Sequence, residues 1–401
     1  MPPVFADYFR SLRYPGFRGY FFAYFITECG VMMQRVAQAW LVYRLSESSF
    51  LLGLVSFFVM SPTLFLGLFG GSLANRYNPY RLLLMARFLA MLQSFVLAGL
   101  TLSGLVQVWH ILALALFFGL TQSVQLPARQ AFVIGLVRPQ DLPNVAALSS
   151  GVLNFSRIIG PIVAGWVILA GNEGFVFLAN GLFLVVYLLI MWRLAPSFSS
   201  RKTTARVGLG ASLSHAFHTP RIRAGLMMLA LVSLMAGVNL VLLPVFVRDI
   251  FGSGPDALGI LMGVVGIGAV LASLSVARRK DTTGLEGGIV VSGFLGAVAM
   301  FLFSQTETFL VAFFVLLLES FAIIRVVLSI NALVQLLAPD ELRGRIMALY
   351  TVIFPGFLPV GSLLAGALGE ALGAPTTVLC YSALCAVGTA LFWAFHSTRA
   401  E

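Results

Sequence analysis

Residues 338–349 read APDELRGRIMAL, a short polar stretch between two long apolar runs. Residues 137–148 read VRPQDLPNVAAL and repeat its pattern, because Pro139 corresponds to Pro339 and an acidic residue follows each proline. A proline disfavours helix in the residue before it, and the helix dipole favours an acidic residue in the first turn of the next helix. Both stretches therefore predict helix boundaries. Their separation by half of the chain predicts an internal duplication, the alternative being two unrelated proline turns.

The composition excludes an ordinary soluble domain. The chain of 401 residues is 59% hydrophobic and 10% charged, with a mean hydropathy of +0.97. Its apolar runs have room for about twelve helices of membrane-spanning length. The sequence therefore predicts an all-α integral membrane protein with twelve transmembrane helices in two pseudo-symmetric six-helix bundles. We expect the bundles at 1–194 and 221–401, with a polar cytoplasmic linker at 195–220.

The basic residues are distributed unevenly between the two sides of the expected bundle. The formal net charge is +10, and nearly all of the loop arginines and lysines fall on one side. The opposite loops hold only Arg44 and Arg248. Because basic loops stay in the cytoplasm, both termini are predicted to be cytoplasmic, in a multi-pass membrane protein. The same distribution argues against nucleic acid as a partner.

Several charged side chains interrupt the apolar runs. Burying a charge in a membrane costs several kcal/mol unless it faces water or a partner, so such residues are functional candidates. Glu28 and Arg35 share one helix face, and Gln122, Gln125 and Arg129 fall at helical spacing on another. The full set of candidates comprises Glu28, Arg35, Gln122, Gln125, Arg129, Arg157, Asn239, Glu319 and Arg325.

Four motifs together carry a resemblance to a known family. They are AWLVYRLSES at 39–48, PARQAFV at 127–133, SRIIGPIVAG at 156–165 and PDELRGRIMAL at 339–349. With them the sequence resembles the major facilitator superfamily, and within it the branch that includes macrolide and enterobactin exporters. The resemblance implies a central cavity lined by the first, fourth, seventh and tenth helices, and every candidate except Arg157 belongs to one of those four.

Two further motifs resemble functional elements of the superfamily. The first is a loop motif whose aspartate and arginines latch the two halves together on the cytoplasmic side, although Asn75 replaces the aspartate and cannot supply its charge. The second is a Gly-Pro motif associated with exporters. Each also has a simpler explanation, a basic loop that only sets orientation or glycines that only pack helices closely. The predicted gate comprises Gly71, Asn75, Arg76, Arg81, Arg343 and Arg345, and the packing motif comprises Gly160, Pro161 and Gly165.

Together with the resemblance, these residues predict a secondary transporter of a bacterial inner membrane that exports an amphipathic organic molecule, drug-like or siderophore-like, in exchange for protons. Burial favours the protonated form of a carboxyl group and a nearby arginine favours the ionised form, so Glu28 or Glu319 is expected to carry the proton. Arg157 is the expected buried partner of one of them, and such a pair could be purely structural. The excess of arginine over glutamate at depth predicts negative charge on the substrate.

Other functions are less consistent with the sequence. The two lysines each follow an arginine, so no P-loop is present, and no nucleophile with a base lies at depth, so we expect no enzyme. No metal or cofactor is expected. The alternatives are a lysophospholipid-like lipid flippase or uptake transporter and a non-transporting membrane sensor or scaffold. The expected partners are a small-molecule or lipid substrate, protons and membrane lipid, with the chain as a monomer.

Overall fold

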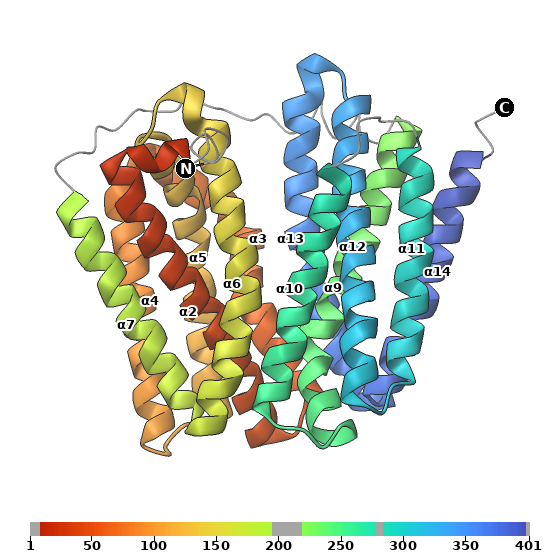
Figure 1. Cartoon of the computed structure of the whole chain (residues 1–401), viewed down its shortest axis with the longest axis horizontal. Helices are drawn as coiled ribbons and strands as arrows, with labels where there is room; N and C mark the ends of the chain where they lie inside the picture. The colour runs from red at the N-terminus through yellow and green to blue at the C-terminus, as the bar shows by residue number, and fades with distance from the viewer. Residues whose placement is uncertain (1–8, 195–218, 278–283, 398–401) are drawn as a thin grey trace. The chain divides into compact units, whose positions relative to one another are not determined.

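The computed structural model describes residues 9–194, 219–277 and 284–397, with the side chains of 67–75 and 396–397 outside that description. Throughout the described residues, the long elements are α-helices (Figure 1). The first six are α2 (Pro15–Ser46), α3 (Ser49–Arg76), α4 (Pro79–Leu102), α5 (Val108–Ile134), α6 (Leu142–Ala170) and α7 (Glu173–Leu194). The second six are α9 (Pro220–Val245), α10 (Pro255–Ala277), α11 (Leu285–Ser304), α12 (Phe309–Leu337), α13 (Asp340–Leu372) and α14 (Ala374–Ser397). The short helices are η1 (Arg10–Arg13), η2 (Pro139–Asp141) and η4 (Phe246–Ile250).

These helices confirm the predicted all-α membrane class. In the described part of the chain, 11 are long and apolar enough to cross a membrane. The remaining long helix is α2, which has 32 residues and carries Glu28 and Arg35 in its apolar length. At about 1.5 Å per residue it is also long enough to span a bilayer. Its polar content is therefore what sets it apart, and the same content makes it a candidate for function.

Both repeated stretches lie between two long helices, as predicted. Arg138 and Ala338 have extended backbones, with ψ of 151° and 126°. In the second stretch α12 ends immediately before Ala338, and α13 carries two acidic residues in its first turn. In the first stretch α5 ends earlier, at Ile134, and Asp141 closes η2 instead of capping α6 with its side chain. The Asp141 carboxylate is engaged elsewhere, by Arg10 and Tyr14.

The chain forms two compact units. The first lies within Met1–Leu45, Phe58–Ala205 and Leu258–Gly263, and the second within Ser46–Phe57, Arg206–Ala257 and Val264–Glu401. Thus the start of α3 packs in the second unit and the start of α10 in the first. The predicted linker 195–220 lies outside the described residues, except that Thr219 and Pro220 start α9.

Each unit has its own buried core. In the first unit an aromatic cluster joins α2, α5 and α7, and in the second an aliphatic cluster joins α9 and α12. The first core includes Phe17, Tyr20, Tyr24, Phe132 and Tyr187. The second includes Leu229, Val232, Val326, Ile330 and Val334. These cores hold the polar side chains described next in fixed positions within each unit.

Candidate functional site

The most deeply buried charge in the first unit is Arg87 on α4. Its side chain is 1% exposed, and its Nη2 atom lies 3.0 Å from Oε1 of Glu28, whose side chain is 11% exposed. The guanidinium carbon also lies 5.1 Å from the ring centroid of Tyr187. Glu28 therefore forms its ion pair with Arg87, and not with Arg157 as the sequence suggested. The reason is that Glu28 faces α4, on which Arg87 lies.

Arg129 on α5 binds the aromatic residues next to this pair. It donates a hydrogen bond to the hydroxyl of Tyr24, and its guanidinium carbon lies 4.7 Å from the Tyr24 ring centroid. Tyr24 in turn stacks on Tyr20, with the ring centroids 5.5 Å apart and the planes at 8°. One turn apart on α2, the two tyrosines thus connect Arg129 to the surroundings of Glu28.

Two more arginines act on Glu28 electrostatically. Arg35, on α2, is half-buried, and within the described residues its Nε atom has no hydrogen-bond partner. Arg157 is exposed, although it lies at the middle of α6. Both interact electrostatically with Glu28, and Arg157 also acts on Arg35. We call Glu28 with Arg35, Arg87, Arg129 and Arg157 the arginine cluster. Its formal charge is +3, because it contains four guanidinium groups and one carboxylate, and of the four only Arg87 lies within ion-pair distance of Glu28 among the described residues.

Two glutamines of α5 supply unused hydrogen-bond acceptors. Gln125 is buried and Gln122 is half-buried. In the part of the chain that the structure describes, neither side-chain carbonyl oxygen has a hydrogen-bond partner. Buried acceptors are normally paired with protein or with water, so this face of α5 offers positions for a donor from outside the protein.

The second unit contains a carboxyl group in very different surroundings. Glu319, on α12, is 0% exposed and accepts a hydrogen bond of 2.9 Å from the amide of Asn239, on α9. Among the described residues its other oxygen, Oε2, has no hydrogen-bond partner, and no arginine lies within ion-pair distance. Burying an ionised carboxylate without a cation is far more costly than burying a neutral acid. The contrast with Glu28 is therefore one of charge compensation.

Arg325 lies six residues after Glu319 on α12. Six residues turn the helix by about 600°, so the two side chains leave it in clearly different directions. Accordingly, the Arg325 guanidinium carbon lies 5.9 Å from the ring centroid of Phe321. The structure thus brings Asn239 and Glu319 together and places Arg325 apart from that pair.

The predicted gate residues lie at helix ends. The Arg343 side chain is held by residues close to it in sequence. It lies 2.7 Å from Asp340 and donates a hydrogen bond to the backbone oxygen of Gln335. Arg345 and Arg81 are exposed, and the Arg76 guanidinium lies 5.9 Å from the Tyr77 ring centroid. The side chains of Gly71 and Asn75 lie outside the described residues. A latch between halves stays a prediction.

The glycines of the α6 motif lie at close helix crossings. A methyl group on Gly160 would be 2.6 Å from Cβ of Met32 and 2.9 Å from the carbonyl oxygen of Cys29, both on α2. On Gly259 of α10, a methyl group would overlap the carbonyl oxygen of Pro161 and lie 3.1 Å from Cα of Gly165. Close packing therefore accounts for this motif without any further role.

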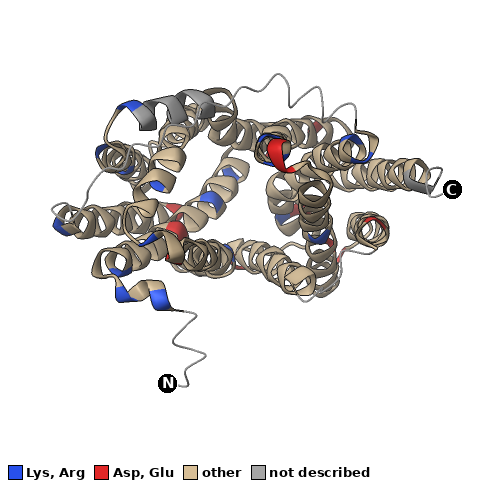
Figure 2. Cartoon of the chain, turned by 90° about the horizontal axis from the view of Figure 1, so that it is seen from above, with Lys and Arg blue, Asp and Glu red and all other residues tan. Residues whose placement is uncertain are grey.

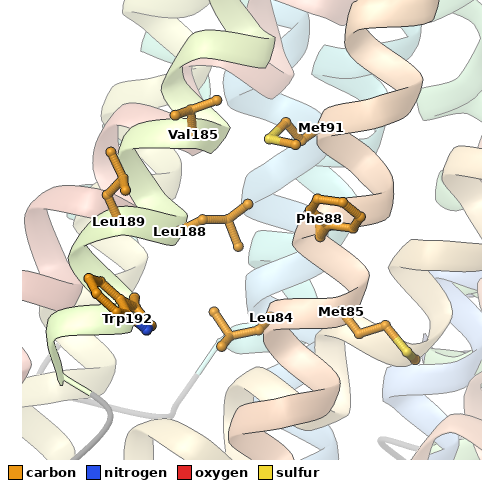
Figure 3. A pocket seen from close by; sticks show the side chains of 8 residues that line it. All are labelled: Leu84, Met85, Phe88, Met91, Val185, Leu188, Leu189 and Trp192. Carbon is orange, nitrogen blue, oxygen red and sulfur yellow. The ribbon is translucent and has the colours of Figure 1, made fainter.

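An apolar groove follows the outer side of the first unit between α4 and α7 (Figure 3). It has a volume of about 460 Å³, and Trp192 and Leu189 on its rim are mostly exposed. Its lining is Leu84, Met85, Phe88, Met91, Val185, Leu188, Leu189 and Trp192. A lining without charge fits hydrocarbon chains and provides no group to recognise a polar substrate.

Arg87 and a buried amide cluster were not predicted from the sequence. In that cluster the Gln34 side-chain oxygen accepts hydrogen bonds from Ser94 at 2.7 Å and Asn180 at 2.6 Å, and the Gln34 amide donates to Gln93 at 3.1 Å. Arg87 lies eight residues after Pro79, the first residue of α4. Counting helix turns from that proline would have placed it well inside the span. The described residues contain no group of three or more His, Cys, Asp or Glu side chains suited to a metal.

Comparison with known proteins supports the resemblance drawn from the motifs. Residues 6–401 match the family described as transmembrane secretion effectors. The staphyloferrin A transporter of Staphylococcus aureus is 24% identical over 363 residues, which cover 88% of this chain and 90% of that protein. The enterobactin exporter EntS of Shigella boydii is 25% identical over 365 residues, which cover 89% and 86%. The crystal structure of the nucleoside transporter NupG has the same fold, with a TM-score of 0.76 at 14% identity and coverage of 94% and 98%.

Proposed function

Because the chain belongs to the transmembrane secretion effector family of the major facilitator superfamily, and is thus a membrane transporter, we propose that it exports an amphipathic organic anion in exchange for protons. The observation that carries this proposal is the arginine cluster, in which four guanidinium groups accompany one carboxylate and only Arg87 forms an ion pair with it among the described residues. By their names, the two relatives matched by sequence transport the siderophores staphyloferrin A and enterobactin. We therefore place siderophore-like anions first among candidate substrates, ahead of neutral drugs.

The physical reason is the charge left over at depth. Each uncompensated charge inside a membrane protein costs several kcal/mol unless water or a partner solvates it. Arg157 is exposed at the middle of its helix, and Arg35 has an unpaired donor among the described residues. A substrate carboxylate or phenolate would offset this charge, and its hydroxyl groups would donate to the free oxygens of Gln122 and Gln125.

For the coupled proton we propose Glu319 in preference to Glu28. Arg87 lies within ion-pair distance of Glu28 and offsets the charge of its carboxylate. Glu319 has only the amide of Asn239 and no cation within ion-pair distance in the described residues. Gain of a proton at Glu319 from outside and its loss inside would alternate a neutral and a charged group at one position, which is what antiport requires.

We place the arginine-rich ends of the helices, and with them the predicted gate, in the cytoplasm. The positive-inside rule supports this orientation. It gains further support from the two arginines at the opposite ends, because Arg44 pairs with Glu173 at 2.8 Å and Arg248 pairs with Glu47 at 2.6 Å. Those arginines therefore contribute little net positive charge to their side.

The test is transport by the full chain in proteoliposomes, with a siderophore anion, a neutral macrolide and a lysophospholipid as probes. We expect pH-gradient-driven transport of the anion, a severalfold rise in KM for Arg157→Gln, and no change for Arg193→Gln, an exposed arginine at the end of α7. Glu319→Gln should lose gradient-driven transport but keep exchange of labelled for unlabelled anion. Full gradient dependence in Glu319→Gln would contradict the proton assignment, and unchanged anion transport in Arg157→Gln would contradict the substrate assignment.

The apolar groove between α4 and α7 favours a second candidate, the translocation of a lysophospholipid-like lipid. Such a substrate has one acyl chain, and the groove is lined by apolar side chains alone. This candidate predicts lysolipid transport that Leu188→Gln abolishes and Arg157→Gln leaves intact. Absence of transport for all three probes would instead favour a sensor or scaffold.

A further inference from the structure

A polar pocket lies at one end of the first unit, lined by none of the residues of the arginine cluster. It has a volume of about 440 Å³ and is formed by η1, the start of α2 and the α5–α6 connection. Seen from above, η1 lies at the edge of the first unit, next to the start of the described chain (Figure 2). Its lining is Arg10, Arg13, Tyr14, Arg138, Gln140 and Asp141.

The pocket is organised by Asp141. This buried carboxylate lies 3.0 Å from Nε of Arg10 and accepts a hydrogen bond of 2.7 Å from the hydroxyl of Tyr14. That hydrogen bond raises the pKa of Tyr14 above its ordinary value, so the phenol keeps its proton. Arg10 also donates to the backbone oxygen of Gln140. These contacts join η1 to η2 across more than a hundred residues of sequence and fix the pocket wall.

The pocket carries a net charge of +2. Asp141 offsets one of its three arginines, and it is already engaged by Arg10. Arg13 and Arg138 are exposed, and no carboxylate of the described residues lies within ion-pair distance of either. In the repeated stretch of the second half, Arg343, one of its two arginines, pairs with Asp340 at 2.7 Å.

Exposed apolar side chains adjoin the pocket in sequence. Phe9 directly precedes η1 and is 46% exposed, and Ile134 ends α5 and is 48% exposed. Apolar groups beside a basic pocket at the end of membrane-spanning helices are suited to the boundary between headgroups and acyl chains. A small free anion has no apolar part that could pack against these side chains.

We propose that this pocket binds the phosphate of an anionic phospholipid, with Arg13 and Arg138 as its ligands and Arg10 and Tyr14 positioned by Asp141. The inference goes beyond the proposed function and does not depend on the transported substrate. A lipid phosphate contributes one negative charge, which Arg13 and Arg138 can bind in the bidentate manner typical of guanidinium groups. The bound lipid would link the start of α2 to the α5–α6 connection.

The test is native mass spectrometry of the full chain in detergent, titrated with phosphatidylglycerol or phosphatidylcholine. We expect each of Arg13→Gln and Arg138→Gln to weaken phosphatidylglycerol binding roughly fivefold, which corresponds to about 1 kcal/mol per arginine. Arg193→Gln removes the same charge outside the pocket and should leave that affinity unchanged. Phosphatidylcholine binding should be the same in all variants. If the arginine variants fold poorly, Gln140→Glu is the alternative test. It keeps every arginine, adds a negative charge to the pocket and should also weaken phosphatidylglycerol binding.

Two results would overturn the proposal. Wild-type affinity for phosphatidylglycerol in the Arg13→Gln/Arg138→Gln double variant, or an equal loss in Arg193→Gln, would mean that lipid charge is sensed diffusely. Competition by soluble glycerol phosphate at the concentration at which the lipid binds would mean that the pocket takes a free anion. Because the measurement needs no transport, its result tests the lipid proposal independently of the export proposal.

Discussion

Replacing Arg87 with methionine tests the electrostatic arrangement of the first unit directly. The substitution keeps an unbranched side chain of moderate length but removes the only guanidinium within ion-pair distance of Glu28 in the described residues. Both side chains are nearly inaccessible, so water cannot replace the lost partner. Glu28 then keeps a buried charge that only the more distant Arg35, Arg129 and Arg157 can compensate.

The expected loss of stability follows from this burial. Removal of one partner from a buried ion pair costs about 3–5 kcal/mol, and the three remaining arginines place Arg87→Met near the lower limit, at about 3 kcal/mol. Glu28→Gln leaves Arg87 uncompensated in the same way. The double variant Glu28→Gln/Arg87→Met buries no uncompensated charge at this position and should lie within about 1 kcal/mol of the wild type. The two substitutions should therefore be coupled by several kcal/mol.

The measurement is a double-mutant cycle on the full chain in detergent, with unfolding followed by circular dichroism during titration with sodium dodecyl sulfate. Arg193→Met serves as the control, because it removes an exposed arginine and should change the free energy of unfolding by no more than about 0.5 kcal/mol. Additive losses in the double variant would refute the ion pair. A double variant as unstable as Arg87→Met alone would show that Arg87 acts through its contact with the Tyr187 ring.

Three further outcomes can be measured on the same preparation. Gly160→Ala should lower stability by about 1–3 kcal/mol through overpacking, whereas Gly151→Ala, in open space on the same helix, should not, as thermal unfolding would show. Asn180→Ala should cost about 0.6–1.7 kcal/mol, since it removes two hydrogen bonds from the buried amide cluster. Glu370→Gln should speed hydrogen exchange in the first turn of α3, because the carboxylate accepts hydrogen bonds from that turn. Unchanged exchange would mean that this contact does not hold the turn.

The fold was largely predictable because membrane helices depend on local features. The length of an apolar run, a proline at a helix start and the charge of a loop are all properties of neighbouring residues. Pro339 shows this, because α12 ends two residues before it. Pro139 shows where such local rules fail. Helix α5 already ends at Ile134, with Gly135 as its C-cap, and Asp141 pairs with Arg10 instead of capping α6 with its side chain. A local rule fails where a distant residue competes for the same group.

The candidate site was predictable only as a set of charges at depth. Which side chains pair depends on the rotation of each helix about its axis, and neighbouring residues do not determine that rotation. Glu28 pairs with Arg87 on α4, although the sequence had suggested Arg157 as the buried partner of Glu28 or Glu319. Asn239 and Glu319 belong to helices expected to be near each other, but their hydrogen bond could not be inferred from spacing. The amide cluster around Gln34 was missed for the same reason.

The predicted duplication gives these contacts a common interpretation. If both halves descend from one six-helix unit, their polar side chains at depth have diverged in opposite directions. The first unit holds an excess of guanidinium groups in its arginine cluster, and Arg87 compensates Glu28, the carboxylate of that cluster. The second holds Glu319, buried without a cation in the described residues.

An anionic substrate and a proton require opposite surroundings, since the first needs uncompensated positive charge and the second needs a carboxyl group whose charge is costly. A single half could not provide both at one position without forming an ion pair that cancels them. Under the proposed antiport, division of the two tasks between the halves avoids that cancellation and would let a duplicated chain couple one flux to the other.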